Sequence, residues 1–306
     1  MKITVISTFR NEESNLKELI SQVEKFLYEY DYEFILVDDF SDDQSKEIIL
    51  AAKLTNSRIK LLTLSNRFGP APSVLAGFKY ATGKYIVYLD SDLQDPPELI
   101  PSLIQYAIEN DLDVVHTKRT NRLGENSIKM FITNIAYTVI KKISRLKLVE
   151  NCGDFKLLSR RVVDHILLIN ERDPYMRGLV TWVGFKQSYY EYVRQQRYSG
   201  VSKFNVLSLN PVEEFFRGVT SFSQTPLYFI SAAGIIFVAL SIILTVILIA
   251  LKIIGLPTSG WTFIAVLITM SFGINIFFMG TIAIYIARIH RQIIDRPIYI
   301  VDKYYD

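Results

Sequence analysis

One apolar stretch of the sequence leads directly into a group of carboxylates. Residues 85–90, YIVYLD, have the composition of a buried strand, and the acidic residues Asp90, Asp92 and Asp95 follow at its end. Two carboxylates separated by one residue at a strand end can turn toward one divalent cation, and Mg²⁺ or Mn²⁺ accepts such oxygen ligands together with substrate phosphates. The spacing therefore predicts a cation site at Asp90 and Asp92. The alternative is a loop in which Asp95 caps a helix that begins near Pro97.

Alternating strand-like and helix-like stretches surround this motif. The strand-like runs occupy residues 3–8, 33–39, 59–64, 85–90 and 113–118. The helical stretches between them cover residues 11–30, 43–54, 71–81 and 97–110. This alternation predicts an α/β fold with a mostly parallel sheet and helices on both faces, in which ligands bind beyond the carboxyl ends of the strands.

Other polar residues follow the predicted strands at the same edge. Arg10 and Glu12 come after the first strand, and Asp38 and Asp39 end the second. No G-x-G-x-x-G or Walker loop follows any strand, which disfavours a dinucleotide-binding or P-loop enzyme. A phosphate bound here needs another positive partner, and a metal held by carboxylates would supply it.

Bulk composition limits the classes of function. The net charge of +3 over 306 residues gives no reason to expect a nucleic-acid partner, and the single cysteine excludes an internal disulfide. The N-terminal residues 1–13 do not resemble a signal peptide, because their apolar run is short and ends in charge.

The last third of the chain has the composition of membrane-spanning segments. No Asp, Glu, Lys, Arg or His occurs from Gly218 to Leu251, nor from Ile253 to Ala287. A span needs about 20 apolar residues, so we predict two transmembrane helices, 227–251 and 261–287, rather than a buried soluble hairpin. Arginine and lysine residues flank the outer ends of this pair, which places both ends in the cytoplasm by the positive-inside rule.

These patterns divide the chain into four parts. A cytosolic domain spans residues 1–204, and within it residues 125–147 form a basic amphipathic stretch that we predict to lie in the membrane interface. An ordinary core-packed helix is the alternative for that stretch. A juxtamembrane segment at 205–225, the hairpin at 226–288 and a cytosolic tail at 289–306 complete the division.

Five motifs in this order resemble a known family. The stretches VDDFSDD (37–43), LDSDLQDPPE (89–98), NCGDFKLLSRR (151–161), RYSGVSKF (197–204) and RPIYIV (296–301) are similar to those of polyprenyl-phosphate glycosyltransferases related to dolichol-phosphate mannose synthase. The resemblance implies a GT-A fold, a nucleotide-sugar donor, a divalent cation and undecaprenyl phosphate as acceptor. It further implies a multi-pass protein of the bacterial inner membrane, with a cytoplasmic catalytic domain and assembly into homo-oligomers.

The resemblance also implies roles for individual residues. As catalytic residues it indicates Asp92, Asp154 and Arg197, with Asp154 either a base or an orienting group. As metal ligands, Mg²⁺ or Mn²⁺ being the ion, it indicates Asp90, Asp92 and Gln94. The nucleotide and its phosphates would contact Thr8, Arg10, Glu12, Val37, Asp39, Asp90, Ser91, Gln94, Arg119 and Lys203.

Two departures from the family pattern leave the donor open. Arg10 replaces a tyrosine of the usual first-strand motif, and Asn66 and Arg67 stand in exchanged order. UDP-glucose, UDP-galactose, a UDP-N-acetylhexosamine and GDP-mannose all remain candidates. Two rival functions are a processive polysaccharide synthase, whose Q-x-x-R-W motif is missing from residues 194–198, and a non-catalytic membrane scaffold.

Overall fold

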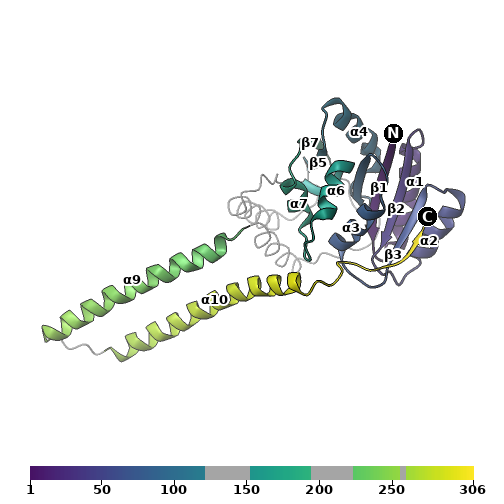
Figure 1. Ribbon diagram of the computed structural model, residues 1–306. Coiled ribbons are helices and arrows are strands. Elements are labelled where there is room, and N and C mark those ends of the chain that lie inside the picture. The colour runs from purple at the N-terminus through teal and green to yellow at the C-terminus, as the bar shows by residue number, and fades with distance from the viewer. Residues whose placement is uncertain (121–151, 194–222, 256–259) are drawn as a thin grey trace.

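The central sheet is built from the predicted strands and three more. The computed structural model describes residues 1–120, 152–193, 223–255 and 260–306. The described strands form one sheet in the order β7-β5-β6-β4-β1-β2-β3-β8 (Figure 1). Their bounds are β1 Lys2–Phe9, β2 Asp31–Asp38, β3 Ile59–Leu64, β4 Tyr85–Asp90, β5 Val114–Arg119, β6 Cys152–Ser159, β7 Gln187–Tyr192 and β8 Val301–Tyr305.

In the parallel part of the sheet, helices connect apolar strands that run in the same direction. β1 pairs in parallel with both β2 and β4, and β2 pairs in parallel with β3, whereas β6 and β8 run antiparallel to their neighbours. The connecting helices in the first half are α1 Glu13–Phe26, α2 Ser45–Thr55, α3 Pro70–Tyr80 and α4 Ile100–Glu109. The predicted α/β class and the five predicted strands are therefore confirmed, while β6, β7 and β8 come in addition.

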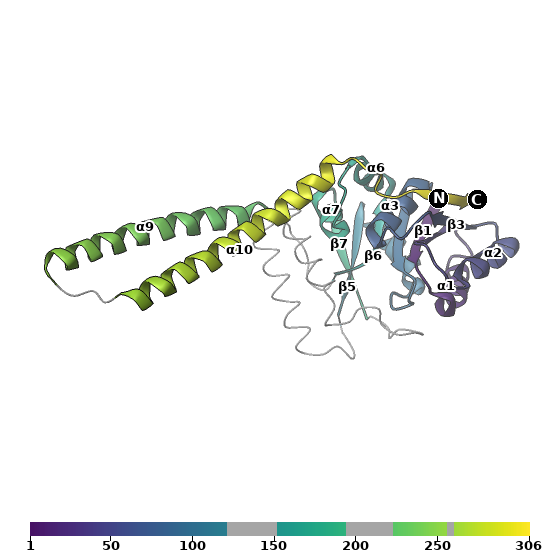
Figure 2. The same cartoon turned by 90° about the horizontal axis from the view of Figure 1, so that it is seen from below.

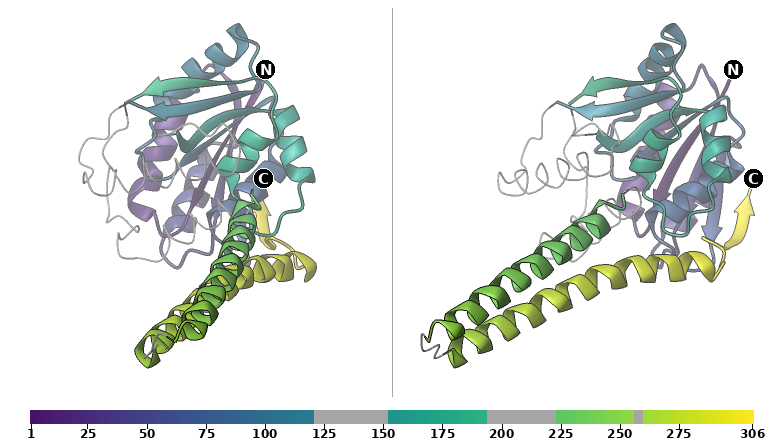
Figure 3. Two further views of the ribbon diagram at one scale, coloured as in Figure 1. Left: turned by 90° about the vertical axis from the view of Figure 1, so that its left-hand side faces the viewer. Right: turned by 60° about the vertical axis from the view of Figure 1, so that its left-hand side comes forward.

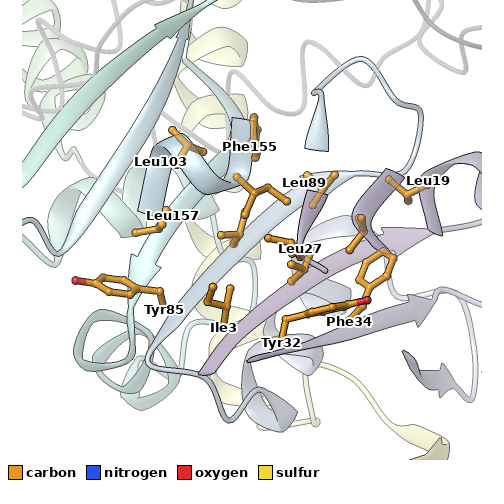
Figure 4. Packing of buried hydrophobic residues seen from close by; sticks show 14 of the residues in the cluster. Ile3, Leu19, Leu27, Tyr32, Phe34, Tyr85, Leu89, Leu103, Phe155 and Leu157 are labelled. Carbon is orange, nitrogen blue, oxygen red and sulfur yellow. The ribbon is translucent and has the colours of Figure 1, made fainter. Parts of the chain in front are cut away.

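Each face of the sheet buries its own apolar cluster. On one face, side chains from α1 and α4, such as Leu19 and Leu103, pack on Phe34 and Phe155 of the strands (Figure 4). On the other face, α3, α6 Arg160–Leu168 and α7 Met176–Trp182 cover the sheet. Full burial of such a side chain contributes about 1.5–3 kcal/mol, so these two layers hold the strand ends in fixed register.

Two long apolar helices leave this domain as an antiparallel hairpin (Figures 1 and 3). α9 covers Thr225–Ile253 and α10 covers Trp261–Ile293, and both are long and apolar enough to cross a membrane. The predicted spans 227–251 and 261–287 lie inside them. α10 continues beyond its predicted end, because its last turns carry charged residues that contact the domain.

The chain returns to the sheet after the hairpin. β8 lies in the predicted tail 289–306 and pairs antiparallel with β3, so the carboxyl terminus lies at the sheet edge (Figure 1). Lys60 of β3 reinforces this edge with ion pairs to Asp306 (2.5 Å) and to the buried Glu33 (3.2 Å). Both ends of the hairpin therefore join the same domain. The predicted interfacial helix 125–147 lies outside the described residues, as does most of the juxtamembrane segment 205–225.

A buried histidine on β5 makes stability depend on pH. His116 donates a hydrogen bond from Nε2 to Oε1 of Gln187 (2.8 Å) and stacks on the ring of Tyr189. Burial, helped by the nearby charge of Lys156, lowers the pKa of His116 to about 4. In the unfolded chain the imidazole takes up a proton near pH 6.5, so the free energy of unfolding should fall as the pH drops from about 6.5 to 4.

The free energy of unfolding of wild type should fall by about 3 kcal/mol through His116 as the pH drops, and we expect His116→Gln to abolish this part of the decrease. Thermal unfolding of the detergent-solubilised chain between pH 4.5 and 7 measures it, and His165→Gln on the exposed face of α6 serves as the matched control. An equally steep pH dependence in wild type and His116→Gln would contradict the assignment.

Candidate active site

The carboxyl ends of the parallel strands bring the predicted polar residues to one edge of the sheet. Register places Thr8 of β1 beside Asp90 of β4, and Phe9 beside Asp38 of β2. The hydroxyl of Tyr88 lies between Thr8 Oγ1 (3.4 Å) and Asp90 Oδ1 (3.2 Å). The strand-end site predicted from the sequence is thus a spatial neighbourhood in the fold.

A tight turn presents the second carboxylate of the D-x-D motif. The backbone N–H of Gln94 donates to Asp92 Oδ1 (3.2 Å), and Leu93 between them adopts a left-handed conformation with φ of 60°. Leu93 and Ser91 are buried, which anchors the turn in the core and leaves Asp92 and Gln94 partly accessible. The turn therefore holds Asp92 partly accessible beside the strand ends.

Negative charge accumulates around Asp90. Burial raises the pKa of Asp90, and the neighbouring carboxylates of Asp95, Asp154 and Asp92 raise it further. Within the described residues, no group of three or more His, Cys, Asp or Glu side chains is arranged to hold a metal ion. A cation at this edge would be held by one or two carboxylates and completed by substrate phosphates. The assignment of Asp90, Asp92 and Gln94 as its ligands stays a prediction.

Asp95 does not cap a helix, which was the alternative considered from the sequence. Its side chain is fully buried, accepts a hydrogen bond from the hydroxyl of Tyr192, and lies 3.6 Å from Nη2 of Arg119. The 3₁₀ turn Pro97–Leu99 instead starts at Pro96 without a side-chain cap. Asp95 and Tyr192 therefore fix Arg119, whose Nε also donates to the Tyr192 hydroxyl (3.2 Å).

Asp154 of β6 is held by an arginine from α7. Nε of Arg177 donates to Oδ1 (2.9 Å) and Nη2 donates to Oδ2 (2.5 Å), which forms a two-pronged ion pair. Burial alone would raise the pKa of Asp154, but the charge and hydrogen bonds of Arg177 outweigh it and hold the pKa below its usual range. The buried ammonium of Lys156 acts in the same direction. Asp154 is therefore an ionised, oriented carboxylate.

Asp39 makes loop contacts at the other side of the strand ends. Its buried carboxylate accepts from the backbone N–H groups of Phe68 (2.7 Å) and Gly69 (3.0 Å), where Gly69 has a φ of 97° that favours glycine. Burial raises the pKa of Asp39. Asp38 caps its own turn by accepting from Ser41 N (2.8 Å).

The loop after β1 is joined to the loop after β2. Glu12 is buried and accepts from Asn15, and its backbone N–H donates to the hydroxyl of Ser45 (3.1 Å). Arg10 Nε reaches the carbonyl of Phe40 (3.4 Å). These contacts give the two loops a defined shape.

For three predicted residues, no side-chain contact with this neighbourhood is described. The side chain of Val37 is buried beneath α3, so a ligand would meet only its main chain. Arg197 and Lys203 lie outside the described residues. Conversely, sequence reasoning missed Arg177, Tyr192 and Lys156. Lys156 belongs to the GDFKL motif and was within reach, whereas no local signal marks Arg177 or Tyr192, because only the sheet topology brings them to Asp154 and Asp95.

Known proteins resemble this chain in sequence and in fold. Residues 4–167 match the sequence pattern described as "Glycosyl transferase family 2". An uncharacterized glycosyltransferase, YkcC of Bacillus subtilis, is 36% identical over 291 residues, covering 95% of this chain and 88% of that protein. The SfII prophage-derived bactoprenol glucosyl transferase of Shigella flexneri is 34% identical over 306 residues, covering 99% and 98%. A crystal structure of glucosyl-3-phosphoglycerate synthase from Mycobacterium tuberculosis in complex with phosphoglyceric acid has a TM-score of 0.49 at 19% identity, covering 71% of this chain and 80% of that one.

The matching sequence pattern and the relatives are those of glycosyltransferases. The chain belongs to glycosyl transferase family 2, and the family resemblance expected from its motifs is confirmed.

The packing of Gly153 against Arg119 provides a test of this site. A Cβ at position 153 would lie 2.5 Å from Nη2 of Arg119, so Gly153→Ala should displace the guanidinium while leaving the fold intact. Loss of a charged hydrogen-bonding partner should weaken donor binding about tenfold or more. The measurement is KM for the nucleotide-sugar beside a thermal unfolding curve. Gly280→Ala, where a Cβ meets open space, is the control, and an unchanged KM in Gly153→Ala would argue against a role for Arg119.

Proposed function

We propose that the protein transfers a sugar from a nucleotide-sugar to undecaprenyl phosphate, inverts the anomeric centre, and does so with a divalent cation. The observation that carries the proposal is the cluster of Asp90, Asp92, Asp95 and Asp154 at the strand ends, flanked by Arg119 and Arg177. Such a site suits a reaction in which one phosphate-bearing molecule displaces another. The relatives named bactoprenol glucosyl transferases support a polyprenyl acceptor.

The donor would lie across the ends of β1, β2 and β4. In this proposal Asp39 contacts the nucleoside, with Thr8, Arg10, Glu12 and the main chain of Val37 around it. The donor diphosphate would lie against the turn that carries Asp90, Ser91, Asp92 and Gln94. A bound Mg²⁺ or Mn²⁺ would neutralise the leaving diphosphate there. Arg119, Arg197 and Lys203 would contact phosphates, and such electrostatic contacts are often the largest single term in catalysis.

The acceptor needs orientation more than deprotonation. The second pKa of a phosphate monoester is roughly 6, so its attacking oxygen is already ionised near neutral pH. A general base works best when its pKa lies near the working pH, and the lowered pKa of Asp154 makes it a poor base. We therefore assign Asp154 an orienting role, in which Arg177 balances its charge. Direct attack by one nucleophile inverts the anomeric centre.

The acceptor also requires the site to lie at a membrane. Withdrawing a polyprenyl chain from lipid costs about 0.8 kcal/mol per CH₂, so the enzyme must bring its site to the interface. α9 and α10 would anchor it there, with the predicted interfacial helix 125–147 beside them. Because β8 pairs with β3, the domain and the tail would share one side of the membrane, and the arginines flanking the hairpin support the cytoplasm as that side.

A donor panel tests the proposal. Purified full-length protein is incubated with undecaprenyl phosphate and Mn²⁺ or Mg²⁺. The donors, tested one at a time, are UDP-glucose, UDP-galactose, UDP-N-acetylglucosamine and GDP-mannose. Mass spectrometry identifies the lipid products. We expect one glycosylated polyprenyl phosphate, with UDP-glucose the first donor to test because the named relatives are glucosyl transferases. No lipid product from any donor, together with no nucleotide binding, would contradict the proposal and favour a scaffold.

Removing the charge of Asp92 should abolish transfer. We expect Asp92→Asn to lower kcat by about 10²–10³, the loss typical of one electrostatic contact to developing charge. The matched control is Asp111→Asn, which neutralises a fully exposed aspartate. Unfolding curves should coincide for all three proteins, and turnover of Asp92→Asn close to that of wild type would rule out the assignment.

A further inference from the structure

The last turns of α10 contact a loop of the catalytic domain through several polar groups. This loop, residues 169–175, joins α6 to α7 and is called the docking loop below. Arg288 pairs with Glu171, and Arg291 Nη2 lies 3.3 Å from Asp173 Oδ2. In the other direction, Arg172 pairs with Asp295 just beyond the helix. Figure 2 shows the end of α10 beside α6 and α7.

Hydrogen bonds between the side chain of Gln292 and the main chain of the docking loop fix how these two segments align. Gln292 accepts from the backbone N–H of Arg172 (3.0 Å) and donates to the carbonyl of Asn170. The side chains of Arg288 and Glu171 are only 17% and 20% exposed, so solvent screens their attraction less than that of a surface pair. The end of α10 is also held from the far side, because β8 follows it and pairs with β3.

The docking loop leads without interruption into α7. Tyr175 is buried, α7 begins at Met176, and Arg177 in its first turn makes the two-pronged pair with Asp154. A helix of seven residues has little stability of its own, so its position depends on what holds it. Leu179 and Val180 hold it on the sheet side, and the docking loop holds its beginning.

We propose that Arg288 and Glu171 are positioning residues, through which the membrane helix α10 sets α7 and thereby holds Arg177 in register with Asp154. The orienting role of Asp154 rests on the function proposed above. In this arrangement the hairpin does more than attach the enzyme to lipid. Its seating on the docking loop assembles the Asp154–Arg177 pair, so catalytic competence depends on α10 being correctly placed relative to the domain.

A charge-swap cycle tests the coupling. The variants Arg288→Glu, Glu171→Arg and the double exchange are prepared as full chains in nanodiscs. Lys186→Glu is the control, because it reverses one charge of a solvent-exposed pair in which Lys186 Nζ lies 3.8 Å from Asp111 Oδ2. We expect each single variant to lower kcat roughly 3- to 30-fold, the range for residues that couple sites, while KM for the nucleotide-sugar stays within about twofold. The double exchange should recover most of the loss.

A second background separates positioning from general support. If Arg288 acts through Arg177, then adding Arg288→Glu to Arg177→Ala should cost no further activity. A merely structural role would lower kcat by the same factor in both backgrounds, and that result would overturn the proposal.

Hydrogen–deuterium exchange tests the docking without any sugar transfer. We expect faster exchange across residues 169–182 in Arg288→Glu and Glu171→Arg, near wild-type exchange in the double exchange, and no change in Lys186→Glu. Unchanged exchange in both single variants would overturn the coupling, whatever the enzyme transfers. If instead the exchange pattern is as expected but wild type glycosylates no polyprenyl phosphate, the proposed function fails and the docking stands.

Discussion

The mutual repulsion of carboxylates at the end of β4 is the constraint on which the site depends. Asp90 is surrounded by Asp92, Asp95 and Asp154, and burial leaves little water to separate their charges. Two arginines offset part of this repulsion: Arg119 pairs with Asp95, and Arg177 pairs with Asp154. In the function proposed here, the carboxylates of the D-x-D turn bind a cation together with the donor diphosphate. Loop shape, helix placement and sheet order all serve to hold these opposite charges in register.

The same charges explain how the membrane segments relate to the chemistry. A lipid-bound phosphate brings further negative charge to this crowded edge, so the site must meet it in a fixed orientation. β8 and the docking loop tie both sides of the end of α10 to the domain. The end of α10 is therefore attached to the domain at two places, and in the proposal above this attachment positions the Asp154–Arg177 pair.

Much of this could be predicted from the sequence, because local patterns determine it. The short apolar strand-like runs, the two runs without charged residues and the D-x-D turn each carry their own signal, and the first five strands and both apolar helices lie where expected. The rest depends on contacts between distant segments. Asp95 looked like a helix cap, since nothing near it in sequence reveals Tyr192. Arg177 and β8 were missed for the same reason: each acquires its role only when the antiparallel strands complete the sheet.

The proposed function depends most on one event, in which the carboxylates of the D-x-D turn bind a divalent cation together with the donor diphosphate. Calorimetric titration of UDP into the full-length protein, with Mn²⁺ and with EDTA, measures this coupling directly. The account predicts that Mn²⁺ tightens UDP binding at least about tenfold in wild type and has no effect in Asp92→Asn. Equal UDP affinity in Mn²⁺ and in EDTA would contradict it.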